Sequence, residues 1–146
     1  MARYVTRVAT PWPVQQAFAY MSDLRNFAQW DPGVRKVVQT EGEAGGPGSV
    51  FDVTVASGPR DMTLTYRTVE YDEPVGLLVV ARSRTLTSED RVTITPDGDG
   101  CIVTYDAELR LRGVLAVADI GLRSAFRKIG DRAAAGLRAA LEGTEA

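Results

Sequence analysis

Apolar and polar residues alternate over several stretches of the chain, a pattern that is typical of strands with one buried face. The first stretch, residues 3–10, is rich in β-branched and aromatic residues and ends where Pro11 and Pro13 cannot complete a ladder of backbone hydrogen bonds. Six more strand-like stretches follow, at residues 33–39, 50–56, 62–71 and 103–111 and as a pair on either side of residues 84–87. The pattern therefore predicts seven strands.

Two short helices are predicted after the first strand. Apolar residues at helical spacing indicate one helix over residues 14–21, and Ser22 or Asp23 can cap a second one. Trp30 follows, before Asp31-Pro32-Gly33 stops helix formation. We expect Trp30 to be exposed and to act as a candidate gate beside a pocket, with core packing between the two helices as the alternative.

A long helix is predicted after Gly113, at the end of the last strand. Its apolar face is small-sided toward the C-terminus, which favours close approach to the sheet there and a pocket where the helix stands away from the sheet. The residues predicted on this face are Leu115, Ala118, Leu122, Ala125, Ile129, Ala133, Gly136, Leu137 and Ala140.

The parity of the strands predicts which side chains face the interior. A parity change or bulge is expected near Thr68, because Val69 and Tyr71 break the alternation before them. The side chains predicted to point inward on three strands are Phe51, Val53, Val55, Met62, Leu64, Tyr66, Val103, Tyr105, Ala107, Leu109 and Leu111.

Asp90 has the parity of Val92 and Ile94, so its carboxylate is predicted to point inward. Either Asp90 lies near a strand end and reaches solvent, or it is a pocket carboxylate that needs a polar neighbour or a proton. The register over residues 68–95 stays open. A two-residue turn at Thr85-Leu86 would pair Ser83 with Ser88, Ala81 with Asp90, Val79 with Val92, and Arg82 with Glu89 on the outer face; a three-residue turn would set Arg82 beside Asp90.

Length and charge narrow the classes of function. The 146 residues fit one domain, residues 1–146, and 19 acidic against 17 basic side chains give a net charge of −2. No overall positive field attracts a polyphosphate, so nucleic acid is not expected as a partner. No apolar run is long enough to span a membrane, and no secretory signal is visible, so we expect no integral membrane association and a cytoplasmic location.

The chain contains no histidine and a single cysteine, Cys101. Catalytic triads that use histidine and zinc sites rich in histidine or cysteine are therefore excluded, and no disulfide can form within the chain. We expect no metal and no cofactor. Cys101 is predicted to be an ordinary, partly buried residue.

The order β-α-α-β6-α, with the motifs at residues 22–34, 46–51 and 96–105, resembles the polyketide cyclase/dehydrase and lipid-transport family of the START-related, birch-pollen-allergen-like (SRPBCC) superfamily. The resemblance covers the chain from Tyr4 to about Leu141. It implies an α+β helix-grip fold, in which a curved seven-stranded antiparallel sheet wraps a long C-terminal helix around a cavity. The family includes binders, transfer proteins and enzymes, so the shared fold leaves the activity open.

The leading hypothesis is a cofactor-free protein that binds a hydrophobic or amphipathic small molecule, such as a lipid, isoprenoid, sterol-like compound or aromatic polyketide. The alternative is a polyketide cyclase or dehydratase, with Asp90 as acid or base and Tyr66 or Tyr105 polarising an oxygen. The predicted ligand-binding residues are Trp30, Phe51, Val53, Met62, Leu64, Tyr66, Ala81, Asp90, Val92, Tyr105, Ala118, Leu122 and Phe126.

Other local features favour structural roles. The glycine cluster at residues 45–48 lacks the Gly-Lys-Ser/Thr of a phosphate-binding loop and is predicted to connect two strands. Arg123, Arg127, Lys128 and Arg132 form a basic stretch, predicted to be a solvated helix face. A third hypothesis is a protein-interaction module that uses the sheet or this helix, and a homodimer is also left open.

Overall fold

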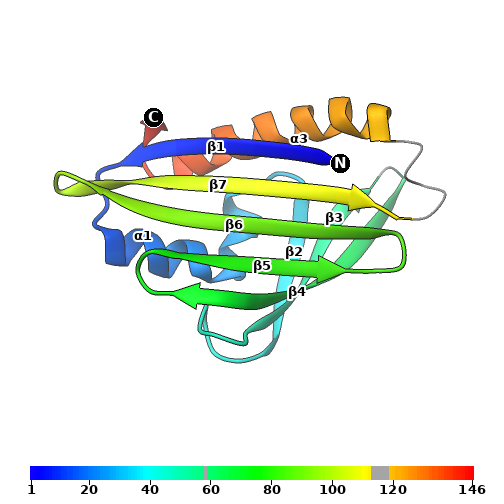
Figure 1. The fold of residues 1–146 in the computed structure, drawn as a ribbon, viewed down its shortest axis with the longest axis horizontal. Coiled ribbons are helices and arrows are strands. Elements are labelled where there is room, and N and C mark those ends of the chain that lie inside the picture. Colours follow the sequence, from blue (N-terminus) through cyan, green and yellow to red (C-terminus); the bar gives the residue numbers. More distant parts are fainter. Residues whose placement is uncertain (58, 113–118) are drawn as a thin grey trace.

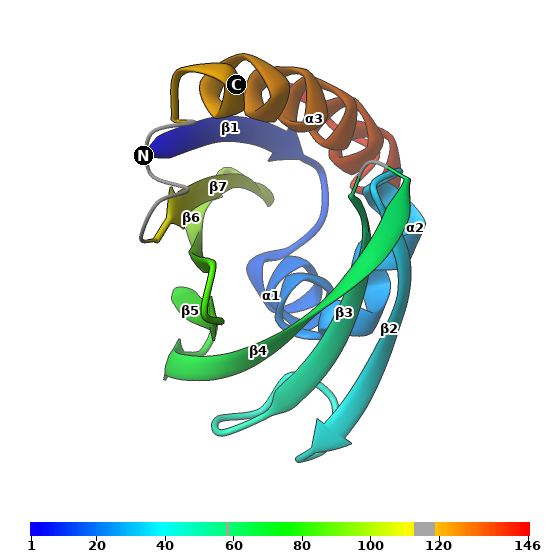
Figure 2. The ribbon, with the colours of Figure 1, turned by 90° about the vertical axis from the view of Figure 1, so that its right-hand side faces the viewer.

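The computed structural model describes residues 1–57, 59–112 and 119–146 and shows one long, curved antiparallel sheet with helices at its concave side and edge (Figures 1 and 2). The strand order is β2-β3-β4-β5-β6-β7-β1-β8. The strands are β1 (Ala2–Thr10), β2 (Val34–Glu41), β3 (Val50–Ser57), β4 (Arg60–Asp72), β5 (Gly76–Arg82), β6 (Leu86–Asp97), β7 (Gly100–Leu111) and β8 (Thr144–Glu145). The seven predicted strands are confirmed, and the two-residue β8 is an addition.

The helices lie where the sequence predicts them. They are α1 (Val14–Ser22), the 3-10 helix η1 (Leu24–Asn26), α2 (Phe27–Trp30) and α3 (Asp119–Ala140). Asp23 caps η1, since its side chain accepts a hydrogen bond from the Arg25 backbone N–H at 3.1 Å. Figure 2 shows α1 inside the curve of the sheet and α3 running alongside β1. The helix-grip fold is thus confirmed.

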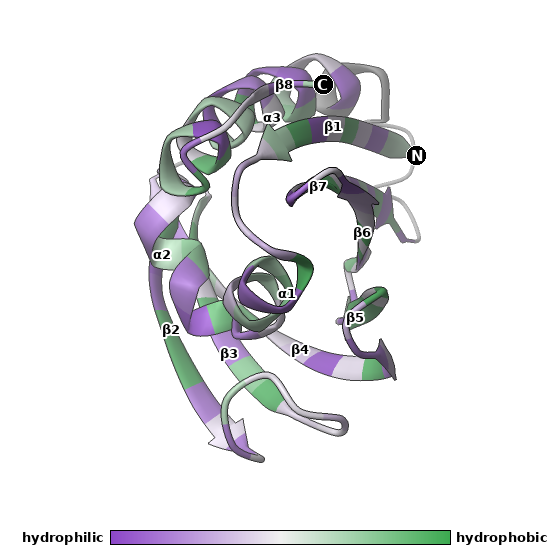
Figure 3. Ribbon diagram, turned by 90° about the vertical axis from the view of Figure 1, so that its left-hand side faces the viewer, coloured by the Kyte–Doolittle hydropathy of each residue, from purple (hydrophilic) through white to green (hydrophobic). Residues whose placement is uncertain are grey.

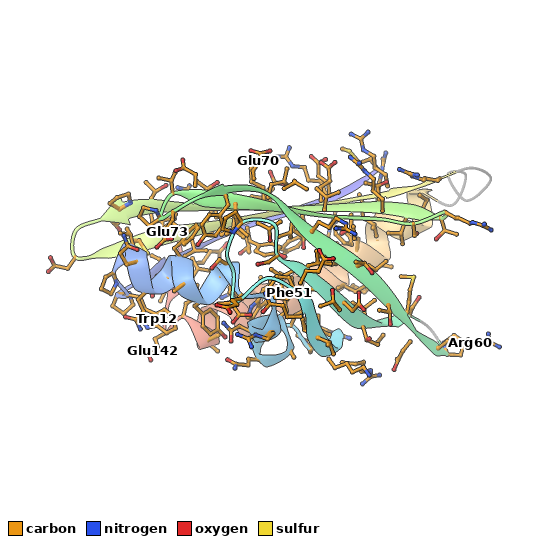
Figure 4. The ribbon with its side chains drawn as sticks, turned by 90° about the horizontal axis from the view of Figure 1, so that it is seen from below. Trp12, Phe51, Arg60, Glu70, Glu73 and Glu142 are labelled. Carbon is orange, nitrogen blue, oxygen red and sulfur yellow. The ribbon has the colours of Figure 1, made fainter. Side chains whose placement is uncertain are left out.

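Two opposite ends of the sheet matter for the site. Trp12, just before α1, lies at one end, and Arg60, at the tip of the β3–β4 hairpin, lies at the other (Figure 4). We call these the Trp12 end and the Arg60 end. At the Trp12 end, α1 buries Phe18 and Met21 against the sheet, and the Phe18 ring packs edge-on against Tyr71.

Inward-facing side chains follow the predicted parity. Figure 3 shows hydrophobic and hydrophilic residues alternating along β2 and β3. Phe51 and Val53 on β3 and Leu64 and Tyr66 on β4 are buried. The predicted bulge is also present, because the β4–β5 register shifts between Thr68 and Glu70.

The predicted register of β5 and β6 is wrong. Ala81 pairs with Ser88, Val79 with Asp90, Leu77 with Val92, and Arg82 with Thr87, so neither the two-residue nor the three-residue turn is present. Ser83 donates its backbone N–H to the Leu86 carbonyl, so the chain reverses around Arg84 and Thr85, one residue earlier than predicted. The Ser83 hydroxyl accepts hydrogen bonds from the backbone N–H groups of Thr85 and Leu86 and so supports this turn. The pairing moves by two residues, and this leaves the inward direction of Asp90 unchanged.

The face of α3 that carries small side chains packs closely against its neighbours, as predicted. A methyl group on Gly136 would lie 1.8 Å from the Trp30 carbonyl oxygen, and one on Gly130 would lie 2.3 Å from the Tyr4 ring. The predicted face is partly wrong, however: Leu137 is buried as predicted, but Ala125 and Ile129 are exposed, and Ala134, which was not predicted on this face, is buried. The helix packs on β1 and α2 rather than lying flat across the sheet, which turns the buried stripe around its axis. Leu115 and Ala118 lie outside the described residues.

Candidate functional site

The most unusual group in the interior is a carboxyl group on β6. Asp90 lies between Val79 of β5 and Ala107 of β7, with a side chain that faces inward and a residue exposure of only 7%. The Tyr105 hydroxyl, on β7, donates a hydrogen bond of 2.5 Å to Asp90 Oδ2. Asp90 is therefore a buried carboxyl with a polar partner, and the interpretation in which it reaches solvent is wrong.

A second buried polar pair lies beside the first. The Tyr66 hydroxyl of β4 and the Ser88 hydroxyl of β6 are 2.7 Å apart, and both residues are buried. Ser88 precedes Asp90 by two positions, so both side chains face the interior from the same strand. The two tyrosines thus bring two hydroxyl groups to one region of an otherwise apolar core.

Three aromatic rings pack around this polar region. Trp30 contacts Phe27 and Tyr105 edge-on, with ring centroids 5.0 and 5.4 Å apart. Trp30 is 4% exposed, so the prediction of an exposed gate is wrong and the core-packing alternative holds. Its indole Nε1 is buried without a hydrogen-bond acceptor among the described residues, although buried donors are usually paired.

Burial changes the protonation of these groups. Desolvation raises the pKa of Asp90 from 3.8 to about 7, although the Tyr105 hydrogen bond acts in the opposite direction. Desolvation, reinforced by the Asp90 charge, raises the pKa of Tyr105 well above its ordinary value, and that of Tyr66 is raised for the same reasons. The Tyr105 hydroxyl therefore stays protonated as a donor, while Asp90 changes its charge near neutral pH.

Asp31 belongs to the same electrostatic environment. Burial raises its pKa, and its charge also raises the pKa values of Asp90, Tyr66 and Tyr105. Sequence reasoning missed this residue because Asp31-Pro32-Gly33 is also a helix stop, and its carboxylate does accept a hydrogen bond from the Gly33 backbone N–H at 2.9 Å. The signal that could have found it is its position directly after a buried aromatic residue.

The structure brings most of the predicted ligand-binding residues into one core. Those that belong to or pack against the buried cluster are Trp30, Phe51, Val53, Met62, Leu64, Tyr66, Ala81, Val92 and Tyr105, with Asp90 buried among them. Phe126 is partly buried on α3 and is not part of that cluster. Ala118 and the Leu122 side chain lie outside what the structure describes.

Inward-facing side chains are covered unequally at the two ends of the sheet. On β7, Cys101 and Val103 are 1% and 0% exposed near the Trp12 end, whereas Ala107, Leu109 and Leu111 are only partly buried toward the Arg60 end. Val55 on β3 and Met62 on β4 are likewise partly buried at the Arg60 end. Apolar inner surface is thus left incompletely covered between the polar pairs and the Arg60 end.

Within residues 1–57, 59–112 and 119–146, no group of three or more acidic or cysteine side chains is arranged to hold a metal ion. None of the helices in this part of the chain has the length and apolar character needed to cross a membrane.

Comparisons with known proteins agree with the fold. Residues 1–142 match the family described as polyketide cyclase / dehydrase and lipid transport. A START superfamily protein from Mycobacterium smegmatis aligns with a TM-score of 0.78 at 14% identity, covering 97% of this chain and 98% of that one. The ZhuI aromatase/cyclase from Streptomyces sp. R1128 aligns with a TM-score of 0.72 at 14% identity, covering 95% and 90%. The comparison with curated protein sequences found no match.

Proposed function

Because the chain belongs to the polyketide cyclase/dehydrase and lipid-transport family, we propose that it binds a hydrophobic or amphipathic small molecule inside the curved sheet. The observation that carries this proposal is the incomplete burial of Ala107, Leu109 and Leu111, which continue the inward face of β7 beyond Tyr105. An apolar ligand that covers this surface gains about 25 cal/mol for each Å² removed from water.

The polar pairs define the kind of ligand. A molecule that enters from the Arg60 end meets apolar side chains first and then the groups of Asp90, Tyr105, Tyr66 and Ser88. A ligand with an apolar body and one hydroxyl or carbonyl group fits this order, since a few polar groups in an apolar pocket fix orientation. Lipids, isoprenoids, sterol-like molecules and aromatic polyketides share this chemistry.

Binding can be tested without knowing the natural ligand. Native mass spectrometry of freshly purified protein should show a retained small molecule, and a panel of hydroxylated and carbonyl-bearing apolar compounds should displace a fluorescent fatty acid. Ala107→Phe should weaken displacement at least tenfold by filling space next to Asp90, whereas Ala56→Phe, at an exposed position of β3, should not. Failure of the whole panel to bind the wild-type protein would contradict the proposal.

Catalysis on a poly-carbonyl precursor is the second candidate function, and the Asp90–Tyr105 pair favours it. A carboxyl with a pKa of about 7 can accept a proton from a carbon next to a carbonyl at neutral pH. The Tyr66 hydroxyl can donate to the carbonyl oxygen when Ser88 is the donor within their pair, since the Tyr105 proton is donated to Asp90. Incubation with a linear poly-carbonyl thioester should then yield cyclised product. Asp90→Asn should abolish this product and leave the binding of an aromatic ligand within about threefold, since the amide keeps the size of the side chain. If wild-type protein gives no product, the binding function alone stands.

A further inference from the structure

The buried carboxylate of Asp90 has a hydrogen-bond donor for only one of its two oxygens. Tyr105 donates to Oδ2, whereas Oδ1 accepts no hydrogen bond in the described part of the chain. Oδ1 is also not fully enclosed by protein atoms, although the residue as a whole is buried. Both oxygens of an ionised carboxylate are acceptors, and buried polar groups are usually paired. Oδ1 therefore lacks a donor that a bound molecule can supply.

The basic side chains of the protein lie away from this carboxylate. The chain has 17 lysine and arginine residues, and all of them fall within the described ranges. All except Arg138 are exposed. Arg138 is half-buried on α3, and its charge acts on Tyr4 of β1 rather than on Asp90. The protein thus provides no buried counter-charge for Asp90.

The ionisable groups that surround Asp90 are acidic or phenolic. Burial raises the pKa of Asp90 to about 7, and the charges of Asp31, after α2, and of Asp106, on the outer face of β7, act in the same direction. The phenols are Tyr105 of β7 and Tyr66 of β4. α1 carries no charged side chain, and the one on β5 is exposed. The surroundings of Asp90 therefore favour a cation over an anion.

We propose that the polar end of the ligand is a protonated amine, which donates to Asp90 Oδ1 and supplies the positive charge that the interior lacks. This inference rests on the proposed binding function and specifies the head group of the ligand. A hydroxyl group can donate to the same oxygen, but it carries no charge. Hydrogen bonds between charged groups are roughly twice as strong as those between neutral groups. The ligand is therefore an amphipathic amine with an apolar body.

The apolar body of such an amine has a surface to cover next to its head group. Ala107 lies opposite Asp90 in the β6–β7 pair, and Leu109 follows Ala107 on the inward face of β7. Both residues are only partly buried. A chain or ring attached to an amine at Asp90 would extend over these two side chains toward the Arg60 end. The head group and the body thus have neighbouring partners on one face of the sheet.

A ligand with a carboxylate head group fits this position less well. Its charge has the same sign as the charges of Asp90 and Asp31, and an ionised carboxylate has no proton to donate. The affinity for such an anion should fall as the pH rises through about 7, where Asp90 loses its proton. The affinity for an amine should rise over the same range, because the amine pairs with the ionised form of Asp90. The two head groups therefore predict opposite pH dependences.

The test compares three ligands that share an aromatic body, namely naphthylethylamine, naphthylethanol and naphthylacetate, by isothermal titration calorimetry at pH 5 and pH 8. The amine stays protonated at both pH values, since alkylamines such as the lysine side chain have a pKa of about 10. At pH 8 the amine should bind at least tenfold more tightly than the alcohol, and at pH 5 the two affinities should agree within about threefold. Naphthylacetate should bind more weakly at pH 8 than at pH 5.

Two variants locate the preference at one carboxylate. Asp90→Asn should remove the preference for the amine at pH 8 and leave the affinity for the alcohol within about threefold, because the amide keeps the size of the side chain. Glu89→Gln is the matched control, since it removes a negative charge from the neighbouring position on the outer face of β6. This control should change the ratio of the amine and alcohol affinities less than about twofold.

The outcomes separate the head group from the binding function itself. If wild-type protein binds the alcohol but binds the amine no more tightly at pH 8, the amine proposal is overturned and the binding function stands. An amine preference that survives Asp90→Asn also overturns it. Failure of all three ligands to bind overturns both. If thermal unfolding shows that Asp90→Asn does not fold, the wild-type protein decides, because an amine affinity that does not rise from pH 5 to pH 8 contradicts the proposal.

Discussion

The Tyr105 hydroxyl donates a 2.5 Å hydrogen bond to Asp90 Oδ2 in the interior of the sheet, and both side chains are buried. The fold positions this pair directly: β6 carries Asp90, β7 carries Tyr105, and the register between the two strands has no shift from Leu86 to Asp97. The carboxyl has little access to water, so its ionisation affects the stability of the whole domain.

Asp90 should make the protein less stable as the pH rises. Its pKa is raised from 3.8 to about 7 in the folded protein, so the folded state holds the proton more tightly than the unfolded state does. The stability gained from this proton is fully present below about pH 4 and is lost progressively up to about pH 7, by an amount on the order of 4 kcal/mol. Asp90→Asn should remove this part of the pH dependence, which urea unfolding at pH 4.5, 6 and 8 would measure. Asp97→Asn, in an exposed turn, is the control, and parallel curves for wild type and Asp90→Asn would refute the prediction.

Tyr105→Phe should destabilise the protein by about 1–3 kcal/mol at pH 8, because it leaves the buried carboxylate without its donor. At pH 5, where Asp90 carries a proton, the loss should be smaller. A double-mutant cycle with Asp90→Asn in urea unfolding measures the coupling between the two side chains. Tyr20→Phe, which removes a hydroxyl bonded to Gln29 on the surface, serves as the comparison and should cost less at both pH values.

Gly136→Ala should destabilise the protein, although alanine is the better helix former by about 1 kcal/mol. A methyl group at this position would lie 1.8 Å from the Trp30 carbonyl oxygen, so either α3 or α2 must shift. The opposite change at an exposed interior position of the same helix, Ala135→Gly, reports propensity alone and should cost about 1 kcal/mol. Thermal unfolding of both variants measures the difference, and a higher midpoint for Gly136→Ala would contradict the observed contact.

Trp30 should report ligand entry. In a Trp12→Phe variant, Trp30 is the remaining tryptophan, and its emission should be blue-shifted because the side chain is 4% exposed. A ligand that reaches Tyr105 should change this emission, since the two rings are in edge-on contact. The reciprocal Trp30→Phe variant, which keeps Trp12, should show little change on saturation with the same ligand. Equal responses from the two tryptophans would argue against binding beside Tyr105.

Strand parity could be predicted from the sequence because it depends on local alternation. The side chains that point inward as expected include Phe51, Val53, Tyr66, Asp90 and Tyr105. Parity alone therefore predicted that the two tyrosines and the carboxyl group share one interior. The helix-grip fold could be predicted from the family resemblance, because the order of helices and strands is shared even where individual residues differ.

Features that depend on contacts between distant segments could not be predicted in this way. The β5–β6 register is an exception, because it depends on local hydrogen bonds from the backbone N–H groups of Thr85 and Leu86 to the Ser83 hydroxyl. The exposure of Ile129 depends on how α3 packs against β1 and α2. The burial of Trp30 depends on Tyr105, which lies 75 positions further along the chain. No local pattern of residues encodes the exposure of Ile129 or the burial of Trp30.

The contact between Gly136 and the Trp30 carbonyl has a mechanical consequence. It holds the C-terminal half of α3 against α2, where Leu137 and Leu141 are also fully buried. Gly130 likewise packs closely against the Tyr4 ring of β1, so α3 is held at a second point along its length. A shift of α3 away from β1 and α2 therefore has to break both contacts.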